Sequence, residues 1–107
     1  MTIVYRNLTP HALSIHIGEG VMLIPPCGTV ARVASHDVEA PPVGDIPCVR
    51  TVYGDVVDLP TSVTGVVLIV SGMVLAQVAD RDDVVAPGQL VRDDAGRPIG
   101  CLGLRRR

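Results

Sequence analysis

Two arginines occupy strand positions where an alternating pattern would turn them inward. Arg32 in "TVARVAS" shares the parity of Val30, and Arg50 in "CVRTVYGDV" shares the parity of Val52. A buried guanidinium without a partner is costly, and its planar fork suits a phosphate or a carboxylate. We therefore expect Arg32 and Arg50 to line a polar cavity for an anionic ligand. An internal ion pair or an edge-strand position is the structural alternative.

The pair Ser71-Gly72 marks a change from an apolar run to a helical pattern. Backbone N–H groups at the start of a helix favour anions, and a small Ser-Gly pair would let a phosphate approach. The sequence thus predicts a second element of the anion site at Ser71 and Gly72. An ordinary helix N-cap at Ser71 is the alternative.

A polar cluster, "DRDD" at residues 80–83, follows that predicted helix. The carboxylates of Asp80, Asp82 and Asp83, with Arg81 among them, could hold a ribose hydroxyl or pair with Arg32 or Arg50; a solvated loop is the other interpretation. A metal site is disfavoured because no His or Glu stands nearby at ligand spacing.

The turn "NLTPH" brings three hydrogen-bonding side chains together. Asn7, Thr9 and His11 could face a ligand from this turn, or they could form a structural turn that closes on its own backbone. His11 with an Asp of residues 80–83 is also the one acid–base pair on which a hydrolase could rest. No known catalytic motif occurs in the chain, so we expect a protein that is not an enzyme and has no cofactor or metal.

Composition restricts the class of partner. The net charge is −2 with both signs spread along the chain, and Phe and Trp are absent. These features disfavour nucleic acid polymers as partners. Three widely spaced cysteines suggest free thiols in a reducing cytoplasm. The apolar run at residues 65–79 is shorter than the roughly 20 residues of a membrane helix, so we expect no membrane span.

Turn signals cut the chain into short strands and one helix, which predicts an α+β fold: a mixed, mostly antiparallel sheet or open barrel of about six to eight strands. We expect one compact domain over residues 1–104 and a flexible basic tail at 105–107. A bulge or kink is expected at Gly54, a loop at residues 40–47, a turn at residues 85–88 and a final hairpin near Ala95-Gly96. The expected strands are 2–5, 12–17, 21–25, 28–35, 48–59, 65–70, 89–93 and 98–104, with the helix at 72–80.

Five landmarks occur in order along nearly the whole chain: "NLTPH", "IPPCGTVARV", "VRTVYGDVVDLP", "LIVSGMVLAQVADRDDVVAPG" and "VRDDAGRPIGC". In this the chain resembles a family of small uncharacterised proteins of phages, prophages and bacteria. The resemblance implies a phage-type protein, and small phage proteins without catalytic motifs often act on host defence. Some of them sequester the nucleotide messengers of defence systems.

Two functional hypotheses follow. The first is a non-enzymatic protein that binds a small anionic, nucleotide-derived ligand in the host cytoplasm and sequesters it. The second is a protein-interaction or assembly module, in which an exposed Val-rich sheet edge pairs with a host protein, a phage protein or another copy of the chain. The second hypothesis includes a homo-oligomer.

Overall fold

The most apolar run of the chain lies at the centre of the fold. The computed structural model describes residues 2–78 and 81–107, and in it strand β6 (Val66–Ile69) lies between β1 (Val4–Asn7) and β7 (Val84–Arg92). Leu68 and Ile69 are both buried, although they point to opposite faces of the sheet. This confirms the expectation, drawn from apolar residues at both parities, that the run is a strand covered on both sides.

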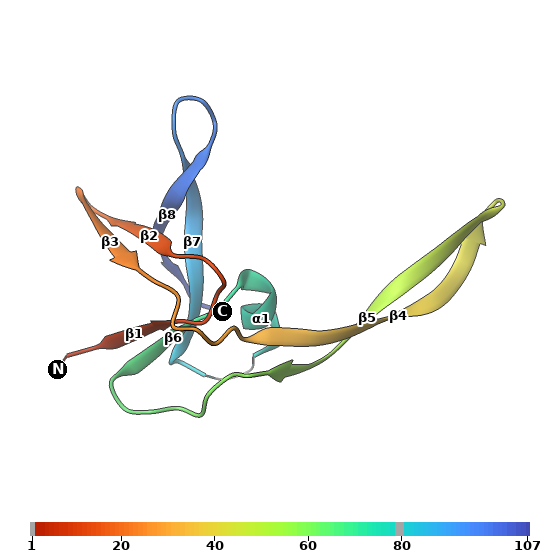
Figure 1. Cartoon of the computed structure of the whole chain (residues 1–107), viewed down its shortest axis with the longest axis horizontal. Helices are drawn as coiled ribbons and strands as arrows, with labels where there is room; N and C mark the ends of the chain where they lie inside the picture. The colour runs from red at the N-terminus through yellow and green to blue at the C-terminus, as the bar shows by residue number, and fades with distance from the viewer. Residues whose placement is uncertain (1, 79–80) are drawn as a thin grey trace.

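A single mixed sheet forms the body of the molecule, with strand order β1-β6-β7-β8-β2-β3. Its remaining strands are β8 (Pro98–Arg105), β2 (Leu13–Ile17) and β3 (Gly20–Ile24). The sheet curls so that the β2–β3 hairpin turns across the body (Figure 1). Three of its five strand pairs are parallel, namely β1–β6, β6–β7 and β2–β8.

The α+β class with a mixed sheet and one short helix is thus confirmed for the described residues. Most paired residues lie in the antiparallel ladders β2–β3, β4–β5 and β7–β8, as expected. The strands β6 and β7 are parallel because the connection between them runs through the helix α1 (Gly72–Gln77).

Two apolar cores lie on the two faces of the sheet. The first includes Leu68 of β6, Val84 of β7 and Val74 of α1. The second includes Ile69 of β6 and Val85 of β7, which directly follow Leu68 and Val84 in the chain. Adjacent residues of both strands therefore enter different cores, which fixes the register of β6 against β7.

The other two strands form an arm that leaves the body. Strands β4 (Arg32–Val43) and β5 (Ile46–Val57) pair only with each other among the described strands. Figure 1 shows this hairpin, which we call the arm (residues 32–57), reaching far beyond the curled sheet. Only its base packs on the body, through Val33 and Val56. The expected bulge is confirmed, because the register shifts where Gly54 and Asp55 face the partner strand.

The prediction of a loop at residues 40–47 is wrong. Most of that segment continues the two strands, and only Gly44 and Asp45 form the turn, with Gly44 at a φ of 55°. The prolines that suggested a loop, Pro41, Pro42 and Pro47, are tolerated because they lie where the ladder is interrupted, at the register shift between Ala40 and Val43.

The prediction of a turn at residues 85–88 is also wrong, because these residues belong to β7. Pro87 fits there because β6 pairs with β7 only through Val84 and Val85, so the edge beside Pro87 is free of β6. Gly88 is required for close approach, since a Cβ at this position would collide with the Leu102 carbonyl oxygen.

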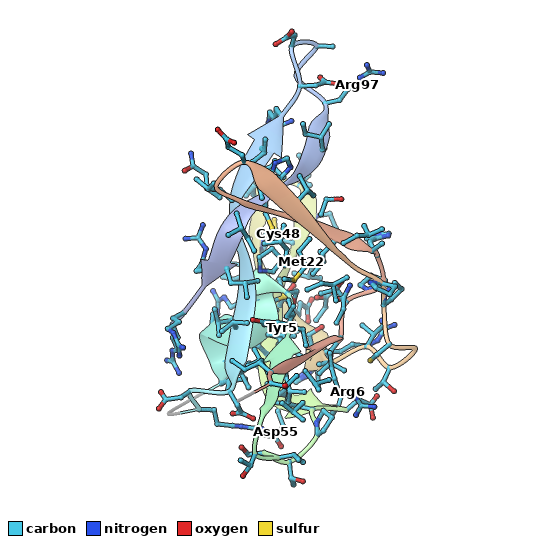
Figure 2. The ribbon with its side chains drawn as sticks, turned by 90° about the vertical axis from the view of Figure 1, so that its left-hand side faces the viewer. Tyr5, Arg6, Met22, Cys48, Asp55 and Arg97 are labelled. Atoms are coloured by element: carbon cyan, nitrogen blue, oxygen red, sulfur yellow. The ribbon has the colours of Figure 1, made fainter. Side chains whose placement is uncertain are left out.

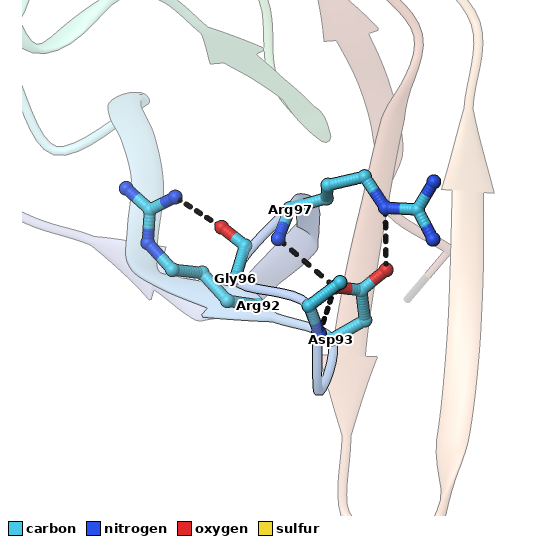
Figure 3. A network of polar contacts seen from close by, with 5 residues as sticks. Arg92, Asp93, Gly96 and Arg97 are labelled. Carbon is cyan, nitrogen blue, oxygen red and sulfur yellow. Dashed lines mark hydrogen bonds and ion pairs between the residues drawn. The ribbon is translucent and has the colours of Figure 1, made fainter.

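The expected final hairpin is confirmed. Its turn is held by the Asp93 carboxylate, which accepts hydrogen bonds from the backbone N–H of Ala95 and Arg97 and from the Arg97 guanidinium (Figure 3). Strand β8 continues to Arg105, which pairs with Ala86, so the sheet includes the first residue of the segment expected as a flexible tail. In the part of the chain that the structure describes, no helix has the length and apolar character needed to cross a membrane.

Candidate functional site

The "NLTPH" turn is built around the buried side chain of Asn7. Its Nδ2 donates to the carbonyl oxygens of His11 (2.8 Å) and Ile24 (3.0 Å). Its Oδ1 accepts from the Thr9 backbone N–H (2.9 Å) and from the Thr9 hydroxyl (2.6 Å). An amide has two donors and two acceptor sites, so Asn7 has none left for a ligand.

This network joins distant parts of the chain. The carbonyl of Asn7 accepts from the Cys27 N–H (2.9 Å), and Asn7 forms a bridge with Pro26. Asn7 therefore fastens the end of β1 to the segment that leaves β3. Thr9 is also buried, whereas the His11 side chain is exposed. For Asn7 and Thr9, this geometry is that of a structural turn that closes on its own backbone.

The expectation that Arg32 and Arg50 point into a shared cavity is wrong. Both are exposed on the arm. Arg32 pairs with Val57 and Arg50 with Val38, which places them about seven residues, or roughly 23 Å, apart along the ribbon. The parity argument failed because it assumed a second layer over each strand, whereas both arginines lie on faces of the arm that the described residues leave exposed.

Ser71 acts as the helix N-cap, since its hydroxyl accepts from the Val74 backbone N–H at 3.3 Å. Gly72 begins a helix of only six residues, and the space around its Cα is open. The predicted strand-to-helix junction is confirmed, and the contacts at Ser71 are those of an ordinary cap.

The cluster after the helix is partly self-paired. Arg81 and Asp83 form a two-pronged ion pair, with Nε–Oδ1 and Nη2–Oδ2 distances of 3.0 and 2.7 Å. The hydrogen bond from Arg81 is the main cause that lowers the pKa of Asp83, against the effect of burial. Asp82 is exposed, and Asp80 lies outside the described residues.

A cavity of about 440 Å³ opens beside this cluster, and we call it the basic pocket. It is lined by Leu75, Val78, Arg81, Asp82, Val84, Arg106 and Arg107. The Arg106 guanidinium donates to the Asp82 carbonyl at 3.1 Å, and that of Arg107 donates to the Val78 carbonyl. The pocket thus combines apolar walls with three guanidinium groups and one carboxylate among its side chains.

Sequence reasoning missed Arg106 and Arg107 as site residues. A run of arginines at the end of a strand usually indicates a frayed tail, which is the expectation for residues 105–107. The position of Arg106 and Arg107 follows from the antiparallel pairing of β7 with β8. Because Ala86 pairs with Arg105, the residues after Arg105 must lie near the start of β7.

The described residues give little support to a hydrolase site or a metal site. Among them, no hydrogen bond or ion pair joins His11 to Asp82 or Asp83, and no cluster of His, Cys, Asp and Glu has the arrangement of a metal site. A smaller apolar hollow of about 150 Å³ lies on the inner side of the curled sheet, lined in part by Tyr5 and Met22 (Figure 2). It offers no charged group.

Comparison of the chain with protein-family models, with curated proteins and with solved structures yields no match in any of the three. The function therefore has to be inferred from the geometry of the arm and of the basic pocket.

Proposed function

We propose that this chain is a protein-interaction module and that the arm is its binding element. The observation that carries this proposal is the arm itself: two strands of 12 residues each that pair only with each other among the described strands, and whose residues beyond the base pack in neither core. A two-stranded hairpin alone is at best marginally stable in water. The arm also exposes large aliphatic side chains, with Val43 at 68%, Ile46 at 66% and Val49 at 66% exposure. A protein surface laid on the arm would bury them and order the hairpin.

The overall dimensions support the same proposal. The radius of gyration is 16.9 Å, whereas a compact chain of this length has about 13 Å. The accessible surface is 7507 Å², whereas a compact monomer of this mass exposes about 5,700 Å². The excess of about 1,800 Å² exceeds the roughly 800 Å² that each partner buries in a standard protein–protein interface.

The outer arm, residues 36–52, is available for binding because the body does not use it. The two apolar cores include Val33 and Val56 from the arm, both at its base. No residue of the outer arm belongs to either core. A segment that costs conformational entropy to order and contributes nothing to the core is explained by a role outside the fold.

A second candidate function, the binding of a small anionic ligand, is favoured by the basic pocket. Its volume lies in the range of small-molecule sites, and Arg81, Arg106 and Arg107 could hold phosphate groups. A role as a phage-type sponge for a nucleotide-derived signal belongs to this candidate. Calorimetry with cyclic dinucleotides and ADP-ribose derivatives tests it: we expect binding that Arg106→Glu abolishes, and no heat from any of them would exclude this form.

Amide hydrogen exchange tests the leading proposal. In a dilute sample of the full chain, shown to be monomeric, peptides from the outer arm should exchange far faster than those from β6 and β7, because an uncovered hairpin opens easily. An outer arm as protected as β6 in that monomer would mean that the arm needs no partner, and the proposal would fail.

A further inference from the structure

We propose that the partner of the arm is a second copy of this chain, and that the tip of each arm docks at the basic pocket of the other copy. This inference rests on the proposed function and names its partner. It is carried by three observations: the charge of the arm tip, the charge and shape of the basic pocket, and the positions of the two along the molecule.

The arm tip, residues 39–48, is acidic and apolar. It carries Glu39 and Asp45 and no basic side chain. Both line a hollow of about 300 Å³ whose other walls include Pro42 and Pro47. Among the described residues neither Glu39 nor Asp45 forms an ion pair. The tip therefore presents carboxylates without cationic partners beside exposed aliphatic groups.

The basic pocket has the complementary character. Within the described residues, Arg106 and Arg107 donate to backbone carbonyls and pair with no carboxylate. The apolar walls, which include Leu75 and Val84, match the aliphatic side chains at the arm tip. A carboxylate brought among these guanidinium groups gains charge-assisted hydrogen bonds.

The positions of tip and pocket permit a closed pair. The pocket lies at the base of the arm, because Leu75, Val78 and Val84 of its lining belong to the core on which the arm base packs. The tip lies at the other end of the ribbon, about 40 Å away for 12-residue strands. Figure 1 shows the C-terminus and α1 at the arm base and the β4–β5 turn at the far end.

Two arms lying antiparallel across a two-fold axis would therefore place each tip at the other copy's pocket. Such an interface is self-complementary and closes at two subunits, so that it forms a dimer and not a filament. The arms would also cover one another's exposed aliphatic faces. The surface excess of each chain is sufficient for an interface of this kind.

Charge reversal with sedimentation equilibrium tests this dimer. The full chain should sediment as two copies, and Asp45→Arg or Arg106→Asp alone should raise the dimer dissociation constant by about tenfold or more. The double variant, which exchanges the two charges, should return to within about threefold of the unaltered chain, since a tenfold loss corresponds to about 1.4 kcal/mol. Asp94→Arg is the matched control, because Asp94 is an exposed acid on the β7–β8 hairpin.

Rescue by the double variant is a result that a folding defect cannot produce. A chain that stays monomeric at millimolar concentration overturns the inference; if its arm also exchanges rapidly, the proposed function stands with a different protein as partner. A dimer unaffected by both single reversals overturns the docking at the basic pocket. Binding of inorganic pyrophosphate is a further test. Saturable binding to a chain that remains monomeric would assign the basic pocket to small anions and contradict the inference.

Discussion

At the scale of single residues, the side chain of Asn7 is the centre of a buried network of polar contacts. It is fully buried and forms four side-chain hydrogen bonds. Asn7→Ala would leave the His11 and Ile24 carbonyls and the Thr9 groups without their partner. We expect a loss of about 3 kcal/mol in the free energy of unfolding, given the cost of unsatisfied buried groups. Urea unfolding followed by circular dichroism measures it.

The control for this change is Gln89→Ala, which removes an amide from an exposed position of β7 and should alter stability by less than about 0.5 kcal/mol. If the two substitutions cost the same, the hydrogen-bond network would not be the element that fastens β1 to the exit of β3.

The Arg81–Asp83 pair predicts a pH dependence. Since the pKa of Asp83 is lowered in the folded chain from the ordinary value of 3.8, the pair stabilises the fold above that value. The stabilisation is lost as the pH falls through the lowered pKa. Asp83→Asn should therefore cost about 1–2 kcal/mol at pH 7 and progressively less as the pH falls through the lowered pKa of Asp83. Unfolding titrations across this range, with Asp94→Asn as the exposed control, test the sign. A constant difference between the two variants at every pH would contradict it.

The side-chain chemistry of this chain was only partly predictable from its sequence. Ser71 was recognisable as a cap because the cap depends on a local pattern. The exposure of Arg32 and Arg50 was not, because parity shows which residues share a face and not whether anything covers that face. The roles of Arg106 and Arg107 depend on the pairing of β7 with β8, which no local pattern contains.

At the scale of elements, the pairing of β7 with β8 depends on Gly88. A Cβ at this position would meet the Leu102 carbonyl oxygen and lie 2.9 Å from that of Gly103. Gly88→Ala should therefore separate the two strands locally and lower the melting temperature by many degrees, as expected of a substitution that costs several kcal/mol.

Gly54→Ala is the matched control in the arm, since a Cβ there would be 3.7 Å from its nearest neighbour, an ordinary contact. Differential scanning calorimetry of the two variants makes the comparison. Equal melting temperatures would show that β7 and β8 need not approach as closely as the structure indicates.

The arm provides a prediction of its own. Because Ser35 and Tyr53 are paired, residues 36–52 can be replaced by Asn-Gly, which favours a two-residue hairpin turn. We expect a body that unfolds cooperatively within about 1 kcal/mol of the full chain, because the outer arm is absent from both cores. Self-association should be lost. Failure of the shortened chain to fold would show that the outer arm is part of the fold.

Strand positions were predictable where the apolar pattern was strong, as in β6 and β2, and less so where proline occurred. Pro41, Pro42, Pro47 and Pro87 all lie in strands. Each favours a loop or turn in the local pattern, although an unpaired edge or an interrupted ladder accommodates proline. Edges are set by strand order, which is a tertiary property.

At the scale of the whole molecule, the arm is the feature that could not be predicted from the sequence. Its residues alternate like those of a half-buried sheet, and nothing local distinguishes a strand in the body from one that leaves it. The radius of gyration of 16.9 Å and the isolated β4–β5 ladder show the difference. In our account, the missing layer over the arm is supplied by a second copy of the chain, and the acidic tip and the basic pocket set the orientation of the pair.

Amide hydrogen exchange measured as the chain concentration is raised tests this claim most directly. The account predicts that peptides of the outer arm, which exchange rapidly in the dilute chain, become strongly protected in step with the rise in molecular mass, while β6 and β7 are already protected at every concentration. Arm peptides that exchange equally fast in the monomer and in the associated state would contradict it.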